Sequence, residues 1–188
     1  QRVRTLPKAA SIALPEAASL EDAVAQYAQT FDPRFGGFGE APKFPRPAVL
    51  EMLLTHYEST RKASSLKMVT QTLDAMARGG MYDHVGGGFH RYSTDERWLV
   101  PHFEKMLYDN AQLLRIYTRA WQLTGTADFR RVAEDIAAYI RREMLGSSGL
   151  FYSARDAEVD AEEGRSYVWT RGELQRLLAK DDYELASR

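Results

Sequence analysis

The chain has 188 residues and no cysteine, with 25 Lys plus Arg residues against 26 Asp plus Glu residues, so its formal net charge is −1. This balance gives no basic surface to attract nucleic acid or an anionic membrane, and neither is an expected partner. The absence of cysteine excludes disulfides, redox thiols and thiolate zinc sites. No apolar run reaches the roughly 18 residues of a membrane span, and we expect a globular, cytoplasmic protein.

Apolar residues recur every three or four positions in six stretches without internal proline, which predicts six helices. Residues 1–18 precede them and are expected to form a linker or truncated edge. The first helix is predicted over 19–30 with Ser19 as its N-cap, and Pro47 opens the second. The later helices are predicted from Ser64 or Ser65 to Gly79, from Pro101 to Gly125, from Thr126 to Gly146, and after a capping box formed by Thr170 and Glu173.

The connections between these helices alternate in length, with long loops around residues 31–46, 80–100 and 146–169 and short ones between them. Every second connection between antiparallel helices falls at the same end, so the three long loops are expected to share one face. This arrangement predicts an all-α fold, an α/α toroid, in which residues 19–188 supply three of about six hairpins. The fourth helix, apolar on more than one side, is expected in the inner ring. An open helical solenoid is the alternative.

The third long loop has a character of its own. Residues 151–154 and 167–170 alternate apolar with polar side chains on either side of an acidic stretch. This pattern predicts a small β-hairpin within residues 151–170.

Three of the four histidines lie in the glycine-rich segment that leads into the fourth helix. His90 and His102 are candidates for an acid–base pair, because imidazole titrates near neutral pH. Helical spacing would place His102, Lys105 and Asp109 on one face. The alternative is structural: His84 and His90 would bond loop backbone, and Lys105 would pair with Asp109. His56, alone on the second helix, is expected to be structural.

The candidate catalytic residues are Asp83, His90, His102, Glu104 and Asp109. Candidate substrate contacts are polar or aromatic side chains of the long loops and the fourth helix: His84, Arg91, Tyr92, Asp95, Trp98, Lys105, Tyr152 and Asp156. Aromatic rings stack on the CH faces of sugars while charged groups bind their hydroxyls, so a sugar or sugar-like ligand is predicted. The alternative is that most aromatic residues of the loops, Tyr167 among them, pack loop against loop, with Trp98 and Tyr152 left as ligand contacts. No metal or cofactor is expected, since a site of His84, His90 and His102 matches no recurrent zinc spacing.

Two reactions fit these residues. An epimerase or isomerase would use His90 and His102 to move a proton next to a carbonyl. A glycosidase would use two carboxylates roughly 5–9.5 Å apart, drawn from Asp83, Asp95, Glu104, Asp109 and Asp156.

The chain resembles the spermatogenesis-associated, thioredoxin-domain-containing family in three segments: FGGFGEAPKFPRP, YDHVGGGFHRYSTDERWLVPHFEKMLYDNAQL and GLFYSARDAEVDAEEGRSYVWT. The resemblance covers about residues 31–170. It implies that the chain is the first half of a six-hairpin toroid similar to N-acylglucosamine 2-epimerases and six-hairpin glycosidases, in a longer protein with an N-terminal thioredoxin-like domain. Glu158 replaces the second aspartate of the family's usual Asp-Ala-Asp, which weakens any role there that needs tight geometry.

A non-catalytic scaffold is the alternative function. Its long loops would bind a partner protein or present a client to the thioredoxin-like domain. A half-toroid also exposes apolar surface where the missing half would pack, so this chain is expected to self-associate.

Overall fold

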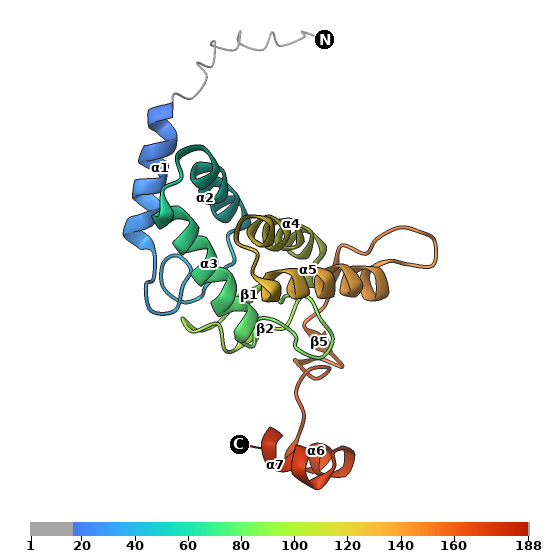
Figure 1. The fold of residues 1–188 in the computed structure, drawn as a ribbon. Coiled ribbons are helices and arrows are strands. Elements are labelled where there is room, and N and C mark those ends of the chain that lie inside the picture. Colours follow the sequence, from blue (N-terminus) through green and yellow to red (C-terminus); the bar gives the residue numbers. More distant parts are fainter. Residues whose placement is uncertain (1–16, 188) are drawn as a thin grey trace, which may run out of the picture.

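The computed structural model describes residues 17–187, so the linker expected over residues 1–18 lies almost wholly outside the described residues. The body consists of helices α1 (Ala17–Thr30), α2 (Pro47–Thr60), α3 (Ala63–Arg78), α4 (Leu107–Thr124) and α5 (Ala127–Tyr139). A π-helical turn, Ile140–Met144, extends α5. Two short helices, α6 (Arg171–Leu177) and α7 (Lys180–Ala186), contact each other and lie apart from the body (Figure 1).

The body has two layers. α4 packs against both α5 and α2, while α3 packs against α2 and α5, and α1 lies on α2. Leu50, Leu73, Leu113 and Ile136 are fully buried between these helices, and burying each such side chain contributes about 1.5–3 kcal/mol. α2 and α4 therefore form the inner layer, as the apolar pattern of the fourth helix predicts, and α1, α3 and α5 form the outer layer.

Short strands join the long loops to one another. β1 (Tyr92–Ser93) pairs with β2 (Pro101–His102), β3 (Lys105–Met106) with β4 (Ala154–Arg155), and β5 (Glu158–Val159) with β6 (Glu162–Glu163), all antiparallel. A bridge between Lys43 and Ser93 ties the first long loop to the second, and the β3–β4 pair ties the second to the third.

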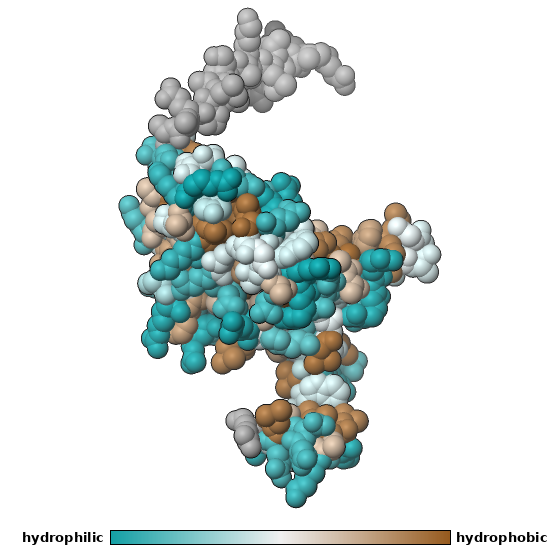
Figure 2. All heavy atoms as spheres, viewed as in Figure 1, coloured by the Kyte–Doolittle hydropathy of each residue, from teal (hydrophilic) through white to brown (hydrophobic). Residues whose placement is uncertain are grey.

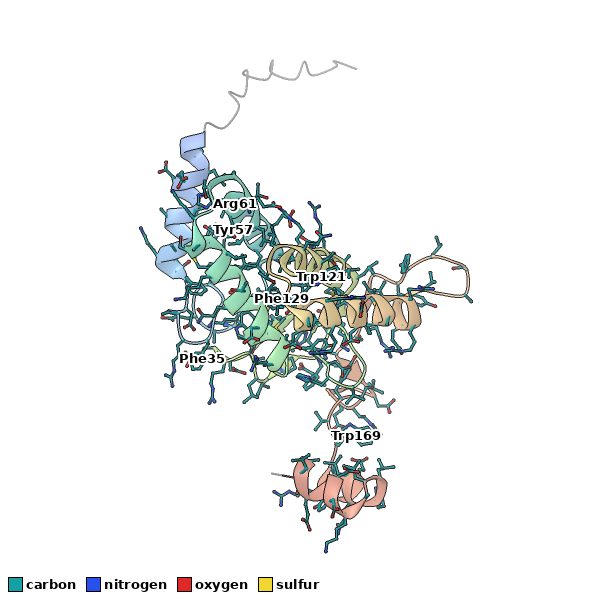
Figure 3. The ribbon with its side chains drawn as sticks, viewed as in Figure 1. Phe35, Tyr57, Arg61, Trp121, Phe129 and Trp169 are labelled. Carbon is teal, nitrogen blue, oxygen red and sulfur yellow. The ribbon has the colours of Figure 1, made fainter. Side chains whose placement is uncertain are left out.

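These pairings confirm that the long loops share one end of the helices. Figure 3 shows the same arrangement: Phe35 of the first long loop and Trp169 of the third lie at the lower side of the body, and Arg61, in the short turn after α2, lies at the upper side.

Several helix boundaries are confirmed. Pro47 is the first residue of α2, and Gly125, with φ 71°, ends α4. The backbone N–H of Glu173 donates to the Thr170 hydroxyl, and the Glu173 carboxylate accepts in return, which is the predicted capping box.

Other boundaries differ from the sequence prediction. α1 already includes Ala17, so Ser19 lies inside it, and Lys62 rather than a serine precedes α3. The Ser65 hydroxyl is instead buried at 2.8 Å from Nδ1 of His56, which is structural as predicted. α5 ends at Tyr139, where the backbone widens into the π-helical turn.

The largest difference from the sequence prediction is the residue at which the fourth helix begins. Helix α4 begins at Leu107, because Pro101–His102 and Lys105–Met106 are extended and pair with other segments. The predicted common helical face of His102, Lys105 and Asp109 therefore does not exist. In the third loop the hairpin is β5–β6, inside the acidic stretch, while the predicted flanking strand around Ala154 pairs with β3.

The surface is mainly hydrophilic over the helices (Figure 2). The exposed apolar side chains include four around the loop after α5 and four in the C-terminal segment: Leu145, Leu150, Phe151 and Tyr152, and Val168, Trp169, Leu177 and Leu185. No helix within residues 17–187 is long and apolar enough to cross a membrane.

Candidate functional site

The first two long loops have the same internal structure. An antiparallel bridge closes each, between Phe31 and Phe38 in the first and between Tyr82 and Phe89 in the second. The aspartate after the first bridged residue, Asp32 or Asp83, accepts hydrogen bonds from two backbone N–H groups of its own turn. The third loop has the matching bridge, between Leu145 and Phe151, but glycine stands where the others have aspartate.

A buried lysine completes each of the first two loops. Nζ of Lys43 donates to Asp32 at 2.5 Å and to the Gly36 carbonyl at 2.9 Å. Nζ of Lys105 donates to Asp83 at 2.7 Å and to the Gly87 carbonyl at 2.9 Å. The predicted Lys105–Asp109 pair is therefore wrong, and Lys105 forms a buried ion pair with Asp83.

The two loops differ in what covers the lysine. In the first, Trp98 is fully buried, its indole N–H donates to the Phe35 carbonyl at 2.9 Å, and Nζ of Lys43 lies 5.7 Å from the ring centroid. Trp98 was predicted to contact substrate, but with no exposed surface it holds the first two loops together instead.

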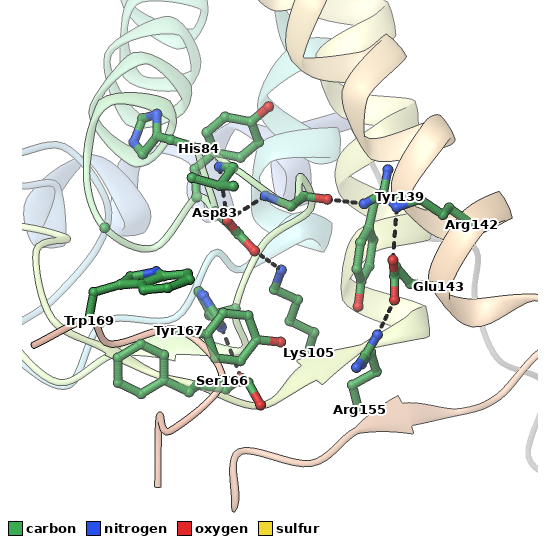
Figure 4. A pocket seen from close by; sticks show the side chains of 16 residues that line it. Asp83, His84, Lys105, Tyr139, Arg142, Glu143, Arg155, Ser166, Tyr167 and Trp169 are labelled. Atoms are coloured by element: carbon green, nitrogen blue, oxygen red, sulfur yellow. Dashed lines mark hydrogen bonds and ion pairs between the residues drawn. The ribbon is translucent and has the colours of Figure 1, made fainter. Parts of the chain in front are cut away.

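Lys105, by contrast, lines a cavity of about 370 Å³ (Figure 4). Tyr139 and Tyr167 flank the ammonium group, with ring centroids 4.6 and 5.0 Å from Nζ. Glu143 lies between Arg142 and Arg155 at one side, and Trp169, half exposed, lies at the other.

The Asp83–Lys105 pair is ionised inside this cavity. Burial opposes ionisation of Asp83, but hydrogen bonds from Lys105 and from the Gly86 N–H outweigh it and hold the pKa of the carboxyl below its usual value. Burial lowers the pKa of the Lys105 ammonium, and the Asp83 carboxylate opposes that change.

His90 is a neutral imidazole in the cavity wall. Burial, reinforced by the charge of Lys105, lowers its pKa to about 4. Nδ1 lies 3.0 Å from the Phe103 carbonyl oxygen, so Nδ1 carries the proton and donates. Nε2 is left as an acceptor, with no hydrogen-bond partner among residues 17–187.

The segments around His90 and Lys105 are extended and adjacent, since the Arg91 N–H donates to the Glu104 carbonyl at 2.8 Å. Successive side chains of extended segments point to opposite faces. His90, Phe103 and Lys105 accordingly line the cavity, whereas Arg91, His102 and Glu104 do not.

These last three residues, together with Asp109, form what we call the polar row. Arg91 donates to Glu104 at 2.8 Å, and Nε2 of His102 lies 3.8 Å from the same carboxylate. Nδ1 of His102 lies 2.8 Å from Glu163 of β6.

Asp109 stands in the first turn of α4 and is only 7% exposed. Burial raises the pKa of its carboxyl to about 6, with Arg91 opposing and Glu104 adding to the rise. Its carboxylate accepts no hydrogen bond from the described part of the chain. The row thus combines a carboxyl whose pKa is raised to about 6 with a carboxylate paired to arginine.

The remaining predicted site residues lie in different parts of the structure. Tyr92 stacks on His102 with centroids 4.9 Å apart and so adjoins the polar row. His84 lines the cavity, and a ring nitrogen lies 3.0 Å from the Gly79 carbonyl, as the structural alternative predicts. Asp95 binds the backbone N–H groups of Arg97 and Val100 and is a turn residue. Tyr152 and Asp156 are exposed and line neither the cavity nor the row.

Sequence reasoning missed several cavity residues: Tyr139, Arg142, Glu143, Arg155 and Tyr167. Nothing in the sequence marks the two arginines and Glu143 as cavity residues, because charged side chains at a helix end or in a strand are usually exposed on the surface. Tyr167 is among the aromatic residues expected to pack loop against loop. The recurrence of aspartate and lysine in the first two loops would have identified the Asp83–Lys105 pair. Within residues 17–187, no three His, Asp or Glu residues are grouped so as to hold a metal ion.

Comparison with known proteins identifies relatives of this chain. Spermatogenesis-associated protein 20 of Mus musculus is 47% identical over 163 residues, which are 81% of this chain and 21% of that protein. The chain is a homologue of that protein. It spans about a fifth of the relative's length. No protein-family model matches it.

Solved structures establish the fold. Cellobiose 2-epimerase from Spirochaeta thermophila superposes with a TM-score of 0.68 at 19% identity, over 74% of this chain and 38% of that one. An unsaturated glucuronyl hydrolase specific for heparin gives a TM-score of 0.61 at 16% identity, over 89% of this chain and 52% of that one. These structural neighbours confirm the predicted α/α-toroid type.

Proposed function

We propose that this chain carries part of a carbohydrate-acting site, in which the polar row transfers a proton to or from a sugar. The observation that supports it most is Asp109, whose carboxyl has a pKa of about 6 beside the Arg91–Glu104 ion pair. A carboxyl with a raised pKa close to a second carboxyl group is an arrangement that lets one act as an acid and the other as a base.

The surroundings of the row suit a sugar. Tyr92 lies between the rings of His102 and Phe44, with centroids 4.9 and 4.8 Å away, and Phe44 is 43% exposed. Such faces stack on sugar CH groups, while Arg91 and Glu104 can bind hydroxyls. Two proteins of the same fold are also named for action on sugars.

The geometry favours carboxylates over the predicted histidine pair. His90 and His102 belong to opposite faces of the paired segments, and the cavity is lined by His90 alone of the two. In the proposed reaction Asp109 donates a proton to a sugar oxygen, and Glu104 acts as the base. This is the chemistry of glycoside hydrolysis.

Replacing Asp109 with asparagine is expected to lower kcat by about 10²- to 10⁴-fold with a much smaller change in KM, because asparagine cannot donate a proton as an acid does. The wild-type rate should fall as the pH rises through about 6, where the carboxyl loses its proton. Steady-state rates of glycan hydrolysis and of reducing-sugar isomerisation by the full-length protein across pH 4–9 would measure both effects.

The matched control is Asp156→Asn, which alters an exposed carboxylate outside the row and should leave both rate and pH profile unchanged. Activity that survives Asp109→Asn would contradict the assignment. The absence of turnover on every glycan and sugar tested, with no sugar-dependent thermal shift, would contradict the carbohydrate function itself and favour the scaffold.

The same substitution has an expected effect that needs no substrate. A carboxyl with a folded-state pKa above its unfolded value destabilises the protein when both states are ionised, so stability is lost as the pH rises from about 4 to 6. Asp109→Asn should therefore raise the free energy of unfolding at pH 8 by about 1–3 kcal/mol and change it little at pH 4. Urea unfolding at the two pH values measures this, and equal effects at both would show that the Asp109 pKa is ordinary.

A further inference from the structure

Lys105 of the second long loop borders a cavity, whereas the equivalent Lys43 lies beneath Trp98. The two positions correspond through their strand partners, since Lys43 pairs with Ser93 and Lys105 pairs with Arg155. Below Trp98, Nζ of Lys43 donates to Asp32 and to the Gly36 carbonyl, and the indole N–H donates to the Phe35 carbonyl. The second loop keeps the ion pair, and Tyr139 packs against Gly88 as Trp98 packs against Gly37, but Lys105 also borders a cavity and Tyr167.

Two polar groups that line this cavity have hydrogen-bonding capacity that no described residue uses. An ammonium group has three N–H donors, and Lys105, 1% exposed, uses two of them on Asp83 and Gly87. His90, 2% exposed, bonds only through Nδ1, which leaves Nε2 as a free acceptor. A cavity with an accessible ring-nitrogen acceptor and an ammonium group in its wall can bind a ligand that offers partners to both.

The charged side chains of the cavity wall indicate the sign of the charge that a ligand would have. Three cationic side chains, Lys105, Arg142 and Arg155, face two carboxylates, Asp83 and Glu143, and His90 is neutral. The wall therefore has a net positive charge. Tyr139 and Tyr167 supply apolar faces, and the volume of about 370 Å³ is enough for a monosaccharide-sized molecule.

We propose that this cavity is a second binding site, separate from the polar row, for a small hydroxy acid of monosaccharide size. The carboxylate of the ligand accepts from Lys105 and Arg155, a hydroxyl donates to Nε2 of His90, and the carbon chain lies against Tyr167. The side chains of the cavity wall account for this choice of ligand. The cationic side chains favour an anion. The neutral imidazole of His90 accepts from a hydroxyl group and offers no donor to a second carboxylate.

The test uses two ligands that differ only at C1, which is a carboxylate in one and a CH2OH group in the other. D-Gluconate and sorbitol have six carbons and the same hydroxyl pattern along the chain, but only gluconate has a carboxylate. Calorimetric titration of the protein should show gluconate binding at least tenfold more tightly than sorbitol. Nε2 of His90 should shift in ¹⁵N NMR when gluconate is added.

Two arginine variants locate the site. Arg155→Ala, on a side chain 44% exposed, should weaken gluconate binding at least tenfold. Arg97→Ala, the matched control beside Phe35 in the first loop, should leave gluconate binding unchanged. Equal affinity for gluconate and sorbitol, or unchanged binding in Arg155→Ala, would overturn the proposal. Inorganic phosphate that binds as tightly as gluconate would also overturn it, because the site would then select any anion rather than a hydroxy acid.

Discussion

Replacing Lys105 with methionine is expected to lower the free energy of unfolding by about 3–5 kcal/mol. The Lys105 side chain is 1% exposed and the Asp83 side chain 13%, so the substitution leaves a carboxylate in a desolvated site without its cation. The Gly87 carbonyl loses its donor as well. Urea unfolding followed by far-UV circular dichroism at pH 7 would measure the loss.

The first long loop provides a matched comparison for this prediction. Lys43→Met removes the equivalent ammonium from Asp32, beneath Trp98, and should cost a similar amount. Lys62→Met, which breaks a surface pair with Glu21, should cost less than about 1 kcal/mol. The variant Asp83→Asn with Lys105→Met should recover part of the stability, because no unpaired charge is left buried. A loss below 1 kcal/mol in Lys105→Met alone would show that Asp83 is solvated.

The helices of this fold follow from local sequence, which explains why they are predictable. Apolar spacing and the end signals Pro47 and Gly125 act within a few residues, and the alternation of loop lengths then places the long loops at one end. The candidate site depends on pairings between distant residues. Pro101 is acceptable both as a first helical residue and in a short strand, and only the partner strand β1 decides between them.

The same limit explains the errors in the site. Lys105 and Asp109 are correctly spaced for a helical pair, but Lys105 pairs with β4 of the third loop and reaches Asp83. Trp98 is a large aromatic residue in a loop, which fits both a ligand contact and a buried contact. Its burial depends on the first loop, whose glycines leave room for its ring.

Replacing Gly88 with alanine is expected to lower the free energy of unfolding by about 2–5 kcal/mol, the sum of two costs. Gly88 has φ +77°, a left-handed conformation that costs an L-residue about 1–2 kcal/mol. An added Cβ would also lie 2.5 Å from Cδ1 of Tyr139, a buried ring that cannot move freely. Thermal and urea unfolding measure the sum.

Gly149→Ala separates these costs. Gly149 has φ +80° in the third loop, but an added Cβ meets nothing within 4 Å, so alanine there should cost only the conformational part, about 1–2 kcal/mol. Equal losses in the two variants would show that Tyr139 yields and that contact with its ring is unimportant. Gly37 meets Trp98 at the same 2.5 Å in the first loop. The second glycine of each pair thus admits an aromatic ring against the turn, and in the second loop that ring forms a wall of the cavity.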